Sequence, residues 1–137
     1  MKIDGRCYCG QITYEAEVEP DAMLVCHCTD CQTLTGTAFR AVVTASAETF
    51  MLRSGVPKTY VKTADSGNKR CQAFCGNCGT PLYACGVDSP RSYTLRIGAI
   101  TQRAAFSPQR QIWRRSALHW VEALSAVPTS DKEFGGH

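Results

Sequence analysis

Apolar and polar residues alternate over several short stretches of this chain. Residues 11–18 show the clearest alternation, in which every second side chain is apolar: Ile12, Tyr14, Ala16 and Val18. A period of two is typical of a half-buried strand. Further β-prone runs occur at residues 38–44, 49–52, 59–62, 81–84 and 92–97, and segments rich in Gly, Ser, Asp and Pro separate them. The pattern predicts a mainly β fold.

Helical periodicity is weak throughout the chain. The best candidate is residues 116–124, where apolar side chains form an imperfect stripe, so we expect at most a short C-terminal helix. From residue 125 the composition turns polar and includes Pro128. No internal repeat or long linker divides the residues before this polar segment. We therefore expect a single domain over residues 1–124 and a poorly ordered polar tail over residues 125–137.

Length and composition narrow the class of protein. The chain has 137 residues, no apolar run long enough to cross a bilayer and no secretory signal at its N-terminus. The net charge is only +3, with arginines concentrated in the C-terminal half: Arg91, Arg96, Arg103, Arg110, Arg114 and Arg115. Such a surface could attract a small anion. No RNA-binding or recognition-helix motif accompanies it, so nucleic-acid binding is a minor alternative.

The nine cysteines are an odd number, which fits a disulfide framework poorly. A cytoplasmic, reducing location is the better expectation, and clustered thiols are then best explained as metal ligands. Seven of the cysteines fall into three tight groups: Cys7 and Cys9, then Cys26, Cys28 and Cys31, then Cys75 and Cys78. Four thiolates close a tetrahedral zinc shell, whereas three leave a position free. Seven clustered cysteines therefore divide into one closed site and one open site.

The two pairs are the candidates for the closed site. The segment from Cys75 to Gly79 has the spacing of a zinc knuckle, and the glycine permits the positive φ that such a turn often needs. One pair cannot complete a shell. Cys7 and Cys9 supply a second pair, and a shared zinc would tie the N-terminal strand to the middle of the chain, although spacing alone does not fix this pairing.

The group Cys26, Cys28 and Cys31 is the candidate for the open site. Cys71 or Cys85 could supply a fourth ligand and make it a second structural site, although a free cysteine is commonly just a small buried hydrophobe. His27 lies between two of the ligands. It is either an ordinary polar residue or a group that supports a ligand or transfers a proton.

The order of these motifs resembles one family. CxCG, then CHCxxC, then FCxxCG, together with Gly36, Phe74 and the segment from Trp113 to Trp120, is similar to the glutathione-dependent formaldehyde-activating enzyme family, which includes centromere protein V. The likeness runs from about Gly5 to Trp120. It implies a fold of small coiled β-sheets organised around zinc. Gln32 and Thr33 depart from the family, in which many members have basic residues after the third cysteine of the triple.

The resemblance also implies ligand sets, cofactors and an activity. Structural zinc would be held by Cys7, Cys9, Cys75 and Cys78, and a second, catalytic-type zinc by Cys26, Cys28 and Cys31. The family's named reaction joins formaldehyde to glutathione, giving S-(hydroxymethyl)glutathione, and is classed as a carbon–sulfur lyase in reverse. The partners implied are a small thiol such as glutathione and an aldehyde.

Ligand chemistry favours the same reaction class. A zinc ion with three thiolates carries a local charge of about −1, so it activates water weakly but can accept an incoming thiol as a thiolate. Two alternatives remain open from the residues alone: a non-catalytic zinc-binding interaction module, and a redox-sensitive zinc switch in which oxidation of the triple ejects the metal. A fourth protein ligand at the triple would favour these alternatives, whereas an open position beside a pocket would favour the enzyme.

Overall fold

The computed structural model describes residues 1–134, and its fold is built from ten strands and a few short helices. The strands are β1 (Lys2–Arg6), β2 (Thr13–Glu17), β3 (Leu24–Cys26), β4 (Arg40–Ser46), β5 (Met51–Ser54), β6 (Lys58–Thr63), β7 (Lys69–Phe74), β8 (Pro81–Gly86), β9 (Ser92–Arg96) and β10 (Arg110–Ile112). The one α-helix among these residues is α1 (Thr29–Thr35). The 3₁₀ turns are η1 (Pro20–Ala22), η2 (Ile97–Ala99), η3 (Arg103–Ala105), η4 (Arg114–Ser116) and η5 (His119–Ala126).

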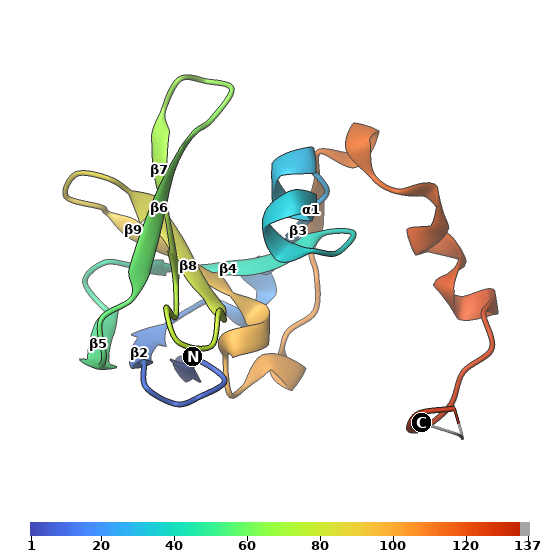
Figure 1. Cartoon of the computed structure of the whole chain (residues 1–137), viewed down its shortest axis with the longest axis horizontal. Coiled ribbons are helices and arrows are strands. Elements are labelled where there is room, and N and C mark those ends of the chain that lie inside the picture. The colour runs from blue at the N-terminus through green and yellow to red at the C-terminus, as the bar shows by residue number, and fades with distance from the viewer. Residues whose placement is uncertain (135–137) are drawn as a thin grey trace.

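The strands form two sheets, and the mainly β fold expected from the sequence is confirmed. A three-stranded sheet has the order β1-β2-β5, and a seven-stranded sheet has the order β10-β3-β4-β9-β8-β7-β6. All neighbours in the larger sheet pair antiparallel except β10 and β3, which pair parallel. Figure 1 shows the β6–β7 hairpin projecting from the body and α1 lying to one side of the strands.

The N-terminal hairpin buries one face, as the alternation of apolar residues predicts. Ile12, Tyr14, Ala16 and Val18 are all at most 4% exposed. Tyr14 lies across the backbone of Gly5, which faces it on β1. A Cβ at Gly5 would lie 2.2 Å from Cζ of Tyr14, so only glycine leaves room for this ring. The close approach of backbone to ring explains a glycine in the middle of a strand.

An aromatic cluster fills the space where the two sheets meet. The ring of Phe50 stacks on Tyr93 at 4.1 Å and meets Tyr14 and Tyr83 at 5.3 and 5.1 Å between centroids. Burial raises the pKa of Tyr83 to about 12, with a smaller contribution from the nearby Cys85 thiol. The cluster therefore joins β2, β8 and β9 into one core.

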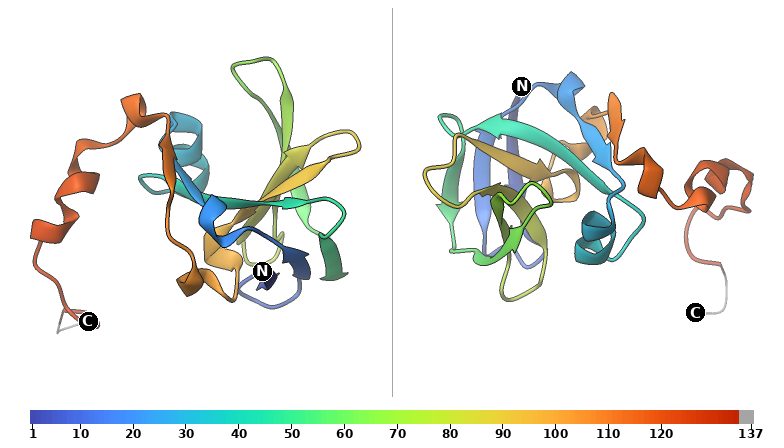
Figure 2. Two further views of the ribbon diagram at one scale, coloured as in Figure 1. Left: turned by 180° about the vertical axis from the view of Figure 1, so that it is seen from behind. Right: turned by 90° about the horizontal axis from the view of Figure 1, so that it is seen from above.

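The C-terminal segment runs away from the sheets (Figures 1 and 2). It holds η4 and η5 rather than the short α-helix expected over residues 116–124, because most of its apolar side chains do not pack on the body: Trp120, Leu124 and Val127 are 46, 52 and 53% exposed. Residues 135–137 of the expected tail lie outside the described residues. Within residues 1–134, no helix combines the length and apolar character needed to cross a lipid bilayer.

The expectation of at most a C-terminal helix also missed α1. This helix buries none of its residues, so it has no apolar stripe to reveal it. Hydrogen bonds at its two ends stabilise it. The Cys28 side chain accepts from the N–H of Cys31 at the start, and Gly36, at φ 71°, ends it in the left-handed region and donates its N–H to the carbonyl of Gln32.

Candidate metal centres

Four cysteines from distant parts of the chain meet at one end of the N-terminal hairpin. The Sγ atoms of Cys7, Cys9, Cys75 and Cys78 all lie within 4.8 Å of one another. Cys9 Sγ is 3.6 Å from Cys7 Sγ and 3.8 Å from Cys75 Sγ. A tetrahedral shell with zinc–sulfur bonds of about 2.3 Å has sulfur atoms about 3.8 Å apart. The cluster therefore has the donor atoms and the spacing to hold a metal ion.

Two similar turns present these sulfur atoms. Gly10 N–H donates to the carbonyl of Cys7 at 3.1 Å, and Gly79 N–H donates to the carbonyl of Cys75 at 2.8 Å. Both glycines adopt a positive φ, 82° and 81°, which closes each turn at little steric cost. Thr80 joins the turns, because its Oγ1 accepts from the N–H of Tyr8 at 2.9 Å.

Backbone N–H groups point at the sulfur atoms of this cluster. Ile12 N–H donates to Cys7 Sγ at 3.3 Å, and Cys9 N–H donates to Cys78 Sγ at 3.4 Å. A hydrogen bond from the Thr80 hydroxyl, followed by backbone N–H groups, lowers the pKa of Cys78 to about 5. These hydrogen bonds favour the thiolate of Cys78, which is the form that binds metal.

The second cluster is built where β3 runs into α1. Cys26 ends β3, Cys28 caps the helix and Cys31 lies in its first turn, and their three Sγ atoms also lie within 4.8 Å of one another. Cys26 is buried, and the other two are partly exposed. Burial raises the pKa of both Cys26 and Cys31. A bound cation is therefore what would hold all three as thiolates together.

Hydrogen bonds hold the segment that carries these three cysteines. Gln32 donates through Nε2 to the carbonyls of His27 and Ser116, at 2.8 and 3.0 Å. His27 is 2% exposed, and its Nε2 shares a hydrogen bond of 2.7 Å with Oε1 of Gln111 on β10. This hydrogen bond ties the His27 ring to β10, and His27 does not belong to the cluster of three sulfur atoms.

A pocket of about 260 Å³ opens beside Cys28. Its wall includes Lys62 of β6, whose ammonium pairs with the carboxylate of Asp30 on α1 at 2.8 Å. Burial raises the pKa of Cys28, but the Cys31 N–H, the neighbouring thiols and the Lys62 charge outweigh it and lower the pKa overall. Trp113 also lines the pocket at φ 55°, a strained conformation for a residue with a Cβ.

Cys71 and Cys85 join neither cluster. They face each other across β7 and β8, and burial, followed by the Cys71 thiol, raises the pKa of Cys85. Among residues 1–134, the triple therefore gathers no fourth cysteine, histidine or carboxylate ligand. A tetrahedral ion bound by these three cysteines would need a fourth ligand from elsewhere, and Cys28 lines a pocket.

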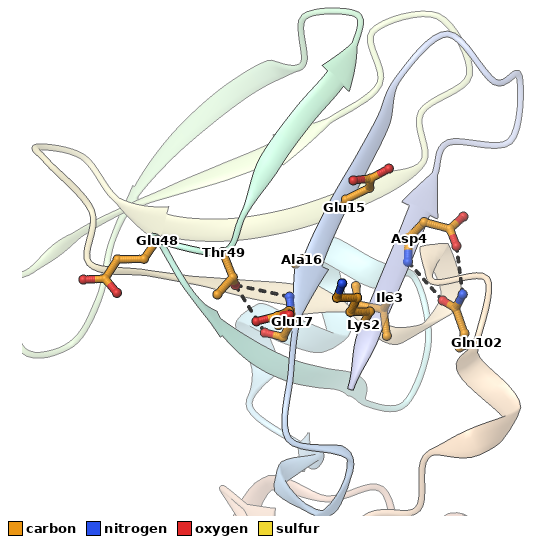
Figure 3. Close-up of a pocket in the computed structure, with 9 residues that line it drawn as sticks. All are labelled: Lys2, Ile3, Asp4, Glu15, Ala16, Glu17, Glu48, Thr49 and Gln102. Atoms are coloured by element: carbon orange, nitrogen blue, oxygen red, sulfur yellow. Dashed lines mark hydrogen bonds between the residues drawn. The ribbon is translucent and has the colours of Figure 1, made fainter.

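A larger pocket of about 520 Å³ lies on the N-terminal hairpin and has no cysteine in its wall (Figure 3). Its lining is rich in carboxylates: Asp4, Glu15, Glu17 and Glu48. Gln102 and Thr101 donate hydrogen bonds to the carboxylate of Asp4 and lower its pKa. The Asp4 carboxylate thus binds the segment after η2. Both cysteine clusters lie outside this pocket.

Comparison with known proteins agrees with this arrangement. The family model for the glutathione-dependent formaldehyde-activating enzyme matches residues 2–116, which include both clusters. The chain belongs to this family. No curated relative matches it in sequence. A crystal structure of a Rhodobacter sphaeroides protein, a Northeast Structural Genomics target, superimposes with a TM-score of 0.60 at 17% identity, covering 79% of this chain and 98% of that one. That likeness shows a shared fold.

Lys62, Trp113 and a buried arginine pair, Arg40 and Arg96, were not assigned to the site from the sequence. Lys62 lies 31 positions after Cys31 in a strand that looks like an ordinary exposed edge. Trp113 belongs to a segment noted only for the family likeness. Lys62 reaches α1 through its ion pair with Asp30, and Trp113 follows β10, which pairs with β3. No local pattern in the sequence encodes these long-range arrangements.

Proposed function

We propose that the protein is a zinc-dependent carbon–sulfur lyase of the S-(hydroxymethyl)glutathione synthase type, which forms or cleaves a thiol–aldehyde adduct. In this proposal Cys7, Cys9, Cys75 and Cys78 hold structural zinc, and Cys26, Cys28 and Cys31 hold the zinc at which the thiol binds. The observation that carries the proposal is the pocket beside Cys28, next to a cluster with three protein ligands among the described residues.

Zinc held by Cys26, Cys28 and Cys31 would supply a position for a thiol sulfur and would keep that sulfur deprotonated while it stays nucleophilic. In the synthetic direction the sulfur attacks the carbonyl carbon of formaldehyde. One carbon–sulfur bond forms, the carbonyl π bond breaks, and the oxygen takes up a proton equivalent to the one that the thiol lost. The reverse sequence cleaves the adduct, and no oxidant or reductant enters.

Residues of the pocket give this reaction its surroundings. The Lys62 ammonium, held by Asp30, supplies positive charge where the carbonyl oxygen gains negative charge. Trp113 forms an apolar wall that limits access of water to the adduct. His27, through Gln111, fixes the loop that holds the three sulfur atoms, so it is a positioning residue.

Exchange spectroscopy with ¹³C-labelled formaldehyde and glutathione tests the proposal at chemical equilibrium. Protein that holds metal at both clusters is expected to raise the exchange rate between free formaldehyde and the adduct about tenfold or more over buffer. Cys28→Ser should abolish the increase. Cys71→Ser is the matched control, because Cys71 lies outside both clusters, and should keep it.

Metal-replete protein that leaves the exchange rate at its buffer value would contradict the proposal. The non-catalytic zinc-binding module would then be the better interpretation. An increase in rate that the Cys28→Ser variant retains would also contradict it, because the reaction would not depend on the triple.

A further inference from the structure

Two buried arginines converge on one neutral oxygen beside the triple. Arg40 and Arg96 are 6 and 8% exposed, and both donate to Oε1 of Gln72, at 3.0 and 2.6 Å. The Nε atom of each guanidinium is also buried, and it finds no partner among the described residues. Both side chains line a cavity of about 300 Å³ together with Gln72.

Two cations in such a place need a counter-charge, because burying an unpaired charge is costly. Within residues 1–134, neither arginine forms an ion pair with a carboxylate. The triple offers such a counter-charge, since Arg40 lies opposite Cys26 across β3 and β4. Three thiolates around a divalent cation would carry a net charge of −1, whereas the two arginines carry a total charge of +2. Before a substrate thiolate joins the cluster, one positive charge is left over, and the cavity gives an anion access to the two arginines.

This cavity and the pocket beside Cys28 are both lined by residues of α1 and β6. Asp30 and Lys62 line the pocket, while Leu34 and Tyr60 line the cavity with the arginine pair. Asp30 and Leu34 are four residues apart on the helix, which is about 6 Å along its axis. Tyr60 and Lys62 are two residues apart on the strand, a similar distance. A thiol bound beside Cys28 could therefore reach the cavity with a carboxylate that lies a few bonds from its sulfur.

We propose that Arg40, Arg96 and Gln72 form a carboxylate-binding site, which holds the thiol substrate by an acidic group while its sulfur lies at the triple. The guanidinium groups offer several N–H donors to a carboxylate, and such charge-assisted bonds are the stronger kind. The inference rests on the proposed function for the identity of the substrate as a thiol, while the anion site itself rests on the arginine pair. It makes these residues determinants of specificity for acidic over neutral thiols.

Propionate tests the anion site without any thiol. In thermal unfolding, propionate is expected to raise the melting temperature of the wild-type protein above that in sodium chloride of equal ionic strength. Gln72→Glu places a carboxylate between the guanidiniums, so this variant should melt higher without additive and lose the response to propionate. Arg96→Gln should also lose it, whereas Arg53→Gln, an exposed arginine on the other sheet, should respond like wild type. No propionate response in the wild type, or an equal response in Gln72→Glu, would overturn the site.

Calorimetry with glutathione and its diethyl ester then separates the two proposals. Glutathione is expected to bind the zinc-loaded protein about tenfold more tightly than the ester, which lacks both carboxylates, and Gln72→Glu should remove the difference. Equal binding of both would leave the proposed function standing and overturn the carboxylate site as a specificity determinant. Binding of neither, with propionate still bound, would overturn the proposed function and with it the assignment to a thiol substrate.

Discussion

Arg40 lies directly opposite Cys26 across the antiparallel pair of β3 and β4. Directly opposed residues point to the same face of a sheet, so a buried guanidinium and a candidate metal ligand share one surface. The pairing joins the two halves of the proposed site, the thiol position and the carboxylate position. It also means that the negative charge of the cluster and the positive charge of the arginine stabilise each other.

The two clusters should differ in how strongly the fold depends on them. Cys75→Ser breaks the site that ties β1 and β2 to the segment after β7, and loss of a structural zinc removes folding free energy comparable to the roughly 5–15 kcal/mol stability of a whole domain. We expect this variant to be unfolded at room temperature by circular dichroism. Cys28→Ser should stay folded, because Cys26, Cys28 and Cys31 span only a short local loop. Equal destabilisation of the two variants would show that the roles are assigned wrongly.

Metal release should proceed in two phases. The four-cysteine cluster can complete a tetrahedral shell and receives several N–H donors, whereas the triple offers three ligands, so a chelator should remove one zinc per chain rapidly and the second slowly. Absorbance of a zinc-sensitive chelator follows the release. Cys28→Ser should show only the slow phase. A single slow equivalent from freshly purified wild-type protein, with the triple open to alkylation, would contradict the two-site description.

Gly5→Ala should destabilise the fold by about 2–3 kcal/mol, since the new Cβ would overlap the buried ring of Tyr14. Urea unfolding measures the change. Gly86→Ala is the matched control, because a Cβ there meets nothing within 4 Å, and it should stay within about 0.5 kcal/mol of wild type. Equal effects of the two substitutions would mean that the ring does not limit the space at Gly5.

Alkaline pH should weaken the fold through Tyr83. Burial raises its pKa to about 12 from an ordinary value of about 10, so the folded protein holds the phenol proton where the unfolded chain has lost it. The resulting stability is present in full below about pH 10 and is lost as pH rises toward 12. Tyr83→Phe should fall less steeply over this window in urea unfolding. The same slope for both proteins would rule out this tyrosine as a source of the alkaline loss.

The sequence allowed parts of this structure to be predicted, for reasons that particular residues make clear. The alternation around Tyr14 encodes β2, because side chains two apart face the same side of a strand. The tight cysteine groups revealed the candidate ligands for a similar reason, since each group is local, whereas the pairing of Cys7 and Cys9 with Cys75 and Cys78 was implied only by the family resemblance. By contrast, Gln72 meets Arg40 and Arg96 across 32 and 24 positions of sequence, through the register of the sheet alone. No local pattern in the sequence indicates this contact.

The most direct test of the central claim is whether a thiol binds through sulfur at Cys26, Cys28 and Cys31. In protein with cobalt in place of zinc, glutathione should increase the thiolate-to-cobalt charge-transfer absorption, because a fourth sulfur joins the shell. S-methylglutathione should leave the band nearly unchanged, since it cannot form a thiolate. Formaldehyde added to the glutathione complex should then alter the band. A spectrum indifferent to glutathione, in protein shown to hold cobalt at both clusters, would contradict the claim.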